Sequence, residues 1–301
     1  MNALHLKSRT IRGALNLVLS TFFFGIAAAL IKLLTTDYSI FEIAFFRNCF
    51  GLVPAFFISR RLGVSGFKSS RPFSHLARGF YGILSMFLIF HAYSLIPLPD
   101  ATAISFAAPL FMTAFSVPLL HEKVGRHRWT AVLVGLIGVL IVLKPGSGML
   151  TIGGISALAS ALFYALAMIS LRKLRSTENA EVTTFYFTLF ATIITGLIVP
   201  VYWKPPDLHG SMMLISVGLL SGTGQFFLTK AYGQAEVSAI SPFIYAAIIW
   251  ATLFGVLFWG HLPTRHTLIG TSIIILSGIY ILHRERVRAV TRDKTIPVPE
   301  P

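Results

Sequence analysis

The chain has 301 residues and a formal net charge of +14, with 55% hydrophobic and 12% charged residues, and its mean hydropathy of +0.76 excludes an ordinary soluble domain. The basic residues stand in short clusters between apolar runs, without interleaved stacking aromatics, so we expect the lipid bilayer and not nucleic acid as the partner of this charge. The one cysteine, Cys49, excludes an internal disulfide framework and a paired-cysteine metal or redox motif.

Apolar runs of about 20 residues, the length that crosses a bilayer as a helix, recur along the chain. We predict an all-α integral membrane protein with about ten transmembrane helices, over residues 14–33, 39–57, 75–95, 101–120, 128–143, 152–171, 182–202, 212–230, 237–259 and 267–282. The first run follows basic residues and contains Ala27-Ala28-Ala29, as a cleaved signal peptide would. We expect it to be retained, because it takes part in an internal repeat.

The two halves of the chain share landmarks at a nearly constant offset. Ala92-Tyr93 recurs as Ala231-Tyr232 (231 − 92 is 139) and Arg126-His127 as Arg265-His266 (265 − 126 is 139). Shifted by 140 instead, the earlier residues Gly13, Ser20 and Lys32 fall on Gly153, Ser160 and Arg172. The common offset favours a duplication, with a first repeat over residues 1–146, a second over 150–283, and a basic, disordered cytoplasmic tail over 284–301.

The predicted orientation follows from the distribution of lysine and arginine. With the N-terminus inside, 20 of the 25 basic residues fall on the cytoplasmic side, four on the other side, and Arg47 alone lies in mid-span. We therefore expect a multi-pass protein of the bacterial inner membrane with both termini in the cytoplasm. Because five spans are an odd number, the second repeat must enter the membrane from the opposite face, so the repeats are inverted.

Inverted halves around a midplane site are the arrangement of many secondary transporters. The short loops leave no room for a soluble catalytic domain, and the absence of a GxxxxGK[ST] motif excludes an encoded ATP-driven pump. His121-Glu122 begins like a zinc-protease motif, but Gly125 stands where the second histidine is needed. We therefore expect a carrier of a small-molecule substrate without catalytic residues, metal or cofactor. A membrane-embedded enzyme and a channel or scaffold are the alternatives, and the oligomeric state stays open.

Ionisable groups at membrane depth are the first site candidates, because each is costly there. Arg47 could attract a carboxylate or phosphate of a substrate across a water-filled cavity, or could be a structural residue bonded to carbonyls or to Glu42. Their five-residue spacing places Glu42 about 140° around the helix, so we expect each to face a neighbouring helix. His91 could relay protons or form a satisfied core hydrogen bond.

Prolines and amphipathic side chains complete the candidate cavity. Pro109 and Pro242 lie in the fourth and ninth spans, where interrupted helices in corresponding halves indicate a binding site. The two prolines are not at equivalent positions, since the offset carries Pro109 onto Ile248. The remaining candidates are side chains that could orient a solute or form its walls: Tyr164, Gln225, Tyr232, Tyr245 and Trp250.

Several stretches together resemble the EamA type of the drug/metabolite transporter superfamily. They are Glu42 to Asn48, Arg78-Gly79, Ala92-Tyr93 through Ala108-Pro109-Leu110, Leu120-His121-Glu122-Lys123, and Gly135 to Gly138 with Leu143-Lys144-Pro145-Gly146. A Gly-Glu pair is common in the family after the fourth helix, where this chain has His121-Glu122. The resemblance implies ATP-independent movement of a small organic solute through a cavity between the halves. The first half is similar to the S-adenosylmethionine uptake carriers, which implies this compound, an amino acid or a related metabolite as substrate. Riboflavin, the substrate of another group of carriers in the family, is the alternative.

Overall fold

The computed structural model describes residues 3–59, 71–121, 125–143, 151–174, 180–235 and 240–294. These ranges contain helices only: α1 (Ala3–Leu34), α2 (Ile40–Ser59), α3 (Pro72–Leu95), α4 (Leu98–Ser105), α5 (Ala108–Leu120), α6 (Arg126–Leu143), α7 (Ile152–Leu174), α8 (Ala180–Tyr202), α9 (Leu208–Gln234), the 3-10 helix η3 (Ser241–Tyr245), α11 (Ala246–Trp259) and α12 (Arg265–Lys294). With α4/α5 and η3/α11 each taken as one broken span, they correspond to the ten predicted spans.

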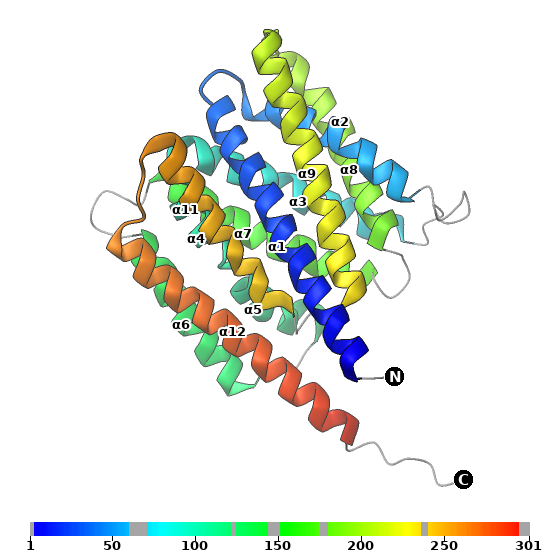
Figure 1. Ribbon diagram of the computed structural model, residues 1–301, viewed down its shortest axis with the longest axis vertical. Helices are drawn as coiled ribbons and strands as arrows, with labels where there is room; N and C mark the ends of the chain where they lie inside the picture. The colour runs from blue at the N-terminus through cyan, green and yellow to red at the C-terminus, as the bar shows by residue number, and fades with distance from the viewer. Residues whose placement is uncertain are drawn as a thin grey trace.

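Length and hydropathy agree with a membrane bundle. Within the described ranges, eight helices are long and apolar enough to cross a bilayer, and Arg265–Ile281 is a shorter apolar helix. The tenth, α2, carries the polar residues Glu42, Arg47 and Asn48, and it packs against α8 and α9. In Figure 1, α1 begins and α12 ends at the same end of the bundle, as an even number of crossings requires.

Local sequence explains where several helices begin and end. Pro72 stands in the first turn of α3, where its missing N–H costs nothing. Asp207 caps α9 by accepting a hydrogen bond from the Gly210 N–H at 2.7 Å. At the end of α3, the Lys32 ammonium donates to the carbonyl oxygens of Tyr93 (2.6 Å) and Ile96 (2.8 Å), which have no partner within the helix.

The helices pair across the two halves with a twofold pattern. The most extensive contacts join α1 to α9 and α3 to α7, and these two pairs exchange when the repeats are exchanged. The pairs α2/α8 and α6/α12 map onto themselves, and both pairs lie side by side in Figure 1. The core therefore sits between the repeats, and neither half buries its apolar surface alone.

The same hydrogen bond occurs twice, once in each half. The Ser20 hydroxyl on α1 donates to the carbonyl oxygen of Gly224 on α9 at 2.8 Å. The Ser160 hydroxyl on α7 donates to the carbonyl oxygen of Ser85 on α3, also at 2.8 Å. Ser20 and Ser160 are a repeat pair in the sequence, and Ser85 and Gly224 are separated by 139 residues (224 − 85). The two inverted repeats therefore meet through equivalent contacts.

The fourth and ninth spans break at equivalent positions even though their prolines do not coincide. The first break lies at Phe106, after α4, and the second at Tyr245, where η3 passes into α11; their separation is 139 (245 − 106). The two rings meet edge to face with centroids 5.0 Å apart. Pro109 is the second residue of α5 and Pro242 the second residue of η3, so each stands at a helix start near the break. The two breaks therefore meet at the contact between the halves.

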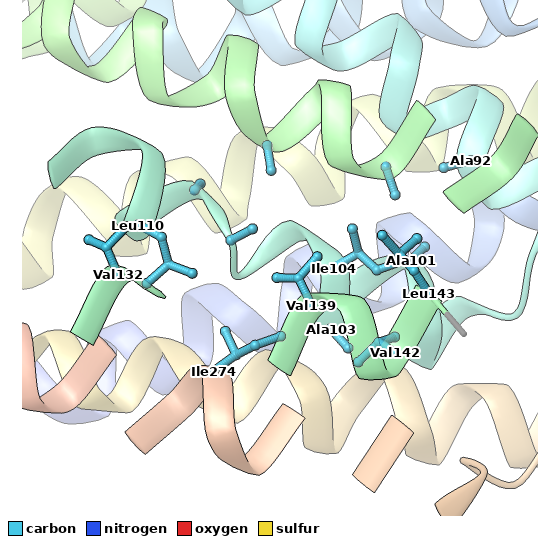
Figure 2. Close-up of a cluster of buried hydrophobic side chains, with 14 of the residues drawn as sticks. Ala92, Ala101, Ala103, Ile104, Leu110, Val132, Val139, Val142, Leu143 and Ile274 are labelled. Atoms are coloured by element: carbon cyan, nitrogen blue, oxygen red, sulfur yellow. The ribbon is translucent and has the colours of Figure 1, made fainter. Parts of the chain in front are cut away.

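A large cluster of small apolar residues surrounds α4. Figure 2 shows Ala101, Ala103 and Ile104 of α4 among side chains of α6 and Ile274 of α12. All four of these residues are at most 2% exposed. Small side chains allow this short helix to lie close to its neighbours, which holds the broken span in place.

One expectation about the C-terminus is wrong in part. Helix α12 continues to Lys294, so residues 284–294 are helical and not disordered. The apolar part of this helix ends near Ile281, and the basic segment extends the same helix without a break. Residues 295–301 lie outside the described ranges.

Candidate functional site

A cavity of about 80 Å³ lies between the halves, at the wall of the broken fourth and ninth spans. Helices α1, α3, α4 and α11 line it, through Thr21, Phe24, Gly25, Ala28, Tyr93, Leu98, Thr102, Ala247 and Ala251. Both repeats therefore contribute walls. The volume is well below the roughly 300–1,000 Å³ of sites for drug-sized ligands. As described, this cavity is too small for a metabolite of nucleoside size.

Trp250 borders this cavity through Thr21. Its indole N–H donates to the Thr21 hydroxyl at 3.2 Å, and its ring meets Phe22 edge to face at 5.1 Å. Gly25 allows this close approach of α1 and α11, since a Cβ there would lie 2.8 Å from the Trp250 Cβ. The contact places one polar group of α1 and a large aromatic of α11 at the same wall.

Arg47 approaches the cavity from α2 through Tyr93. Its Nη1 donates to the side-chain oxygen of Asn48 at 3.1 Å and lies 3.5 Å from the sulfur of Met86 on α3. The guanidinium also interacts electrostatically with Tyr93, which lines the cavity. Among the described residues, no carboxylate pairs with Arg47. Its charge is therefore not neutralised by an acidic side chain of the described structure.

Glu42 lies in a different environment from Arg47. Its side chain is fully buried, and its Oε2 accepts only a long hydrogen bond, 3.4 Å, from the backbone N–H of Lys204, just beyond α8. Its Oε1 is buried without a hydrogen-bond partner. The expected separation of these two residues is found, but Glu42 is not among the side chains that line the described cavity.

His91 has a hydrogen-bond partner between helices. Its Nδ1 lies 3.0 Å from the hydroxyl of Ser156 on α7, and the ring is partly buried. This contact ties α3 to α7, which corresponds to the structural alternative considered for this histidine. A proton-relay role stays a prediction.

Of the other candidate side chains, two tyrosines pack in the core and one glutamine is partly exposed. Tyr245 is 7% exposed and packs on Phe106. Tyr232 is partly buried and packs in the cluster around Leu17 and Ile240. The Gln225 side chain is partly exposed and makes no hydrogen bond to the described residues. Of the ten sequence candidates, none is in the lining of this cavity; Trp250 and Arg47 reach it through Thr21 and Tyr93.

Two residues that the sequence placed elsewhere belong to the transmembrane core. Tyr93 was noted only as a repeat landmark, yet it connects Arg47 to the cavity. Arg78 was counted with the cytoplasmic basic residues, but it lies inside α3 with its guanidinium carbon 4.2 Å from the ring centroid of Phe187 on α8. The signal for Arg78 was present, because the predicted span 75–95 includes it. Tyr164, exposed to 44% in the middle of α7, interacts electrostatically with Arg78.

Known proteins with similar sequences are membrane transporters. A pseudopaline exporter of Pseudomonas aeruginosa is 30% identical over 272 residues, covering 89% of this chain and 94% of that protein. An S-adenosylmethionine uptake transporter of Rickettsia bellii is 28% identical over 255 residues, covering 85% and 88%. A riboflavin transporter of Rhizobium johnstonii is 26% identical over 284 residues, covering 93% and 94%.

A solved structure and a family model extend these likenesses over both halves. A crystal structure at 19% identity shares the fold, with a TM-score of 0.63 over 93% of this chain and 99% of the other. The model described as the EamA-like transporter family matches residues 11–144 and again 151–283. The family and the relatives are transporters and not enzymes. This chain, a multi-pass membrane protein, belongs to the EamA-like transporter family.

Proposed function

We propose that the chain is a secondary transporter of the bacterial inner membrane that moves a small organic metabolite with a carboxylate group, such as S-adenosylmethionine or a related amino-acid compound. It works by alternating access and without ATP. Both termini are in the cytoplasm. A reporter enzyme that is active only in the periplasm, fused to the C-terminus, should therefore be inactive.

The broken spans and the small cavity support alternating access. The cavity is bounded by α1 and α3 on one side and by the broken spans on the other, at the seam between repeats. A rocking motion about this seam enlarges the cavity without breaking either half. This cavity, at about 80 Å³, is smaller than the sites that hold drug-sized ligands, so alternating access requires it to widen during transport.

The observation that carries the substrate class is Arg47. A cation at membrane depth without a carboxylate partner in the described structure is costly, so it is retained where it contacts a cavity or a ligand. A substrate carboxylate would accept charge-assisted hydrogen bonds from its nitrogen atoms. Tyr93, which interacts electrostatically with the guanidinium, lines the cavity that the substrate would enter. The similarity to an S-adenosylmethionine uptake transporter supports a substrate that carries such a carboxylate.

The test is uptake and counterflow in proteoliposomes with labelled S-adenosylmethionine, riboflavin and a set of amino acids, with and without a pH gradient. We expect saturable exchange of a carboxylate-bearing compound. In Arg47→Gln, loss of one charged hydrogen bond should raise KM by about tenfold to a hundredfold. Arg47→Lys should retain part of the affinity, and Lys230→Gln, which removes an exposed cation on α9, should leave KM unchanged. Unchanged transport in Arg47→Gln at normal expression refutes the assignment.

Riboflavin and export are the alternatives that the same experiment separates. A riboflavin transporter and a pseudopaline exporter are both among the relatives. Saturable exchange of riboflavin alone would replace the carboxylate proposal by a riboflavin carrier. The effect of the pH gradient distinguishes proton-coupled transport from facilitated exchange.

A further inference from the structure

Arg78 is a second cation inside the bundle whose charge the described structure does not neutralise. It lies two turns into α3, and Phe187 of α8 covers one face of its guanidinium, with the guanidinium carbon 4.2 Å from the ring centroid. One guanidinium nitrogen rests over the backbone of Gly82, where a Cβ would overlap it. The guanidinium makes no hydrogen bond to any described residue.

The Arg78 side chain is partly buried. Within the described ranges, no Arg78 nitrogen is both fully buried and without a hydrogen-bond partner. Tyr164 of α7 faces the same region and keeps 44% of its surface exposed in mid-helix. Because α3 packs extensively on α7 and also contacts α8, this exposed surface lies between helices. The arrangement places the Arg78 guanidinium and the Tyr164 phenol in one region beside α3, α7 and α8.

Arg78 and Arg47 are connected along one face of α3. Arg78, Gly82, Met86 and Tyr93 fall within an arc of about 80° at 100° per residue, and they span about 22 Å along the helix. Phe187 contacts the first part of this face, Arg47 lies against Met86, and Tyr93 reaches the cavity. A negatively charged solute moving along this face would meet two guanidinium groups in succession.

We propose that Arg78, with Tyr164 and Phe187, forms a second binding station for the carboxylate or phosphate group of a transported solute, between one membrane surface and the central cavity. This inference deepens the proposed transport function and rests on it. A lipid phosphate has the same chemistry, but the group lies between α3, α7 and α8, so a solute is the occupant.

The first test measures the local potential and requires no knowledge of the substrate. In a Cys49→Ser background, Tyr164→Cys provides a single thiol beside Arg78, and its rates of modification by anionic sulfonatoethyl and cationic trimethylammonioethyl thiosulfonates are compared. The positive charge of Arg78, a few ångströms from the thiol, should favour the anionic reagent. Arg78→Gln should therefore lower the anionic-to-cationic rate ratio about fivefold or more. Lys230→Gln is the matched control, since its ammonium lies 5.8 Å from the centroid of the exposed Phe226, and it should change nothing.

Two results of this test would overturn the inference. A thiol at position 164 that neither reagent reaches, or a rate ratio that Arg78→Gln leaves unchanged, shows that no electropositive aqueous station exists there. Met168→Cys, one turn further along α7 and partly buried, serves as reporter if Tyr164→Cys does not fold. If Arg78→Gln changes the rate ratio in detergent but not in phosphatidylcholine nanodiscs, lipid phosphate neutralises the guanidinium, which assigns the site to lipid and also overturns the inference.

The second test separates this inference from the proposed function. In proteoliposomes that exchange S-adenosylmethionine, Arg78→Gln should raise KM several-fold and Arg78→Lys should retain most of the affinity. An unchanged KM in Arg78→Gln contradicts the station. If the unmodified protein moves none of the tested compounds, the substrate proposal fails, and the rate ratio at position 164 still decides whether the station exists.

Discussion

The two helices that end the broken spans terminate in the same left-handed conformation, although their residues differ. Helix α5 ends at His121 with φ 54°, and α11 ends at Gly260 with φ 65°. The two positions are separated by 139 residues (260 − 121), so they are repeat equivalents. Glycine adopts this conformation without strain, whereas a side chain with a Cβ pays for it. His121→Gly should therefore stabilise the protein.

The expected gain follows from two opposing contributions. The left-handed conformation costs a residue with a Cβ about 1–2 kcal/mol, which glycine avoids. Glycine in turn gives the unfolded chain more freedom, which costs about 0.4–1 kcal/mol. His121 is exposed, and its backbone N–H donates to the Ser116 carbonyl, a hydrogen bond that glycine keeps. We expect a net gain in unfolding free energy of about 0.5–1 kcal/mol.

Thermal unfolding in a mild detergent, followed by loss of monodisperse protein, provides the assay. The gain in free energy should appear as a rise in Tm of about 1–4 °C. Gly260→Ala is the converse variant, and it should lower Tm by a similar amount because it places a Cβ at φ 65°. The reasoning fails if His121→Gly lowers Tm, or if Gly260→Ala leaves it unchanged.

Two further predictions concern buried polar groups. Glu42→Gln should leave the fold intact and the unfolding free energy equal or higher by about 1 kcal/mol, because it removes a buried charge whose Oε1 has no partner while an acceptor for the Lys204 N–H remains. A loss of more than about 2 kcal/mol in detergent unfolding would indicate a partner for the charge. Ser160→Ala removes a donor to the Ser85 carbonyl and should cost about 1 kcal/mol, and the repeat equivalent Ser20→Ala should cost a similar amount. A difference above about 1 kcal/mol between these two variants would contradict equivalent contacts.

Sequence reasoning succeeded where it depended on length and periodic chemistry. Apolar runs must be helical in a bilayer because every backbone N–H and C=O needs a partner there, and the ten expected spans are found. The offset of the repeats also predicted equivalence for Ser20 and Ser160, which make the same hydrogen bond. The spacing of Glu42 and Arg47 indicated different neighbours, because five residues turn a helix by about 140°.

Tertiary structure decided what each polar group faces. The prolines at 109 and 242 suggested unmatched interruptions, but the breaks are equivalent, and Phe106 and Tyr245 at the two breaks pack on each other across the halves. Such a contact depends on residues far apart in the chain, which periodicity cannot place. Arg78 shows the same limit: its position near a predicted helix start suggested a cytoplasmic charge, and only the packing of α7 and α8 places its guanidinium between helices.

The sequence by itself determined the class of protein, because hydropathy, span length and an odd number of spans per repeat are one-dimensional properties that a bilayer converts directly into topology. Only the tertiary structure decided the site. The cavity is enclosed by Thr21, Tyr93, Thr102 and Ala247, which come from four helices and both halves. The physical reason is that a binding surface is made by side chains that converge in space, and convergence is set by helix packing and not by order along the chain.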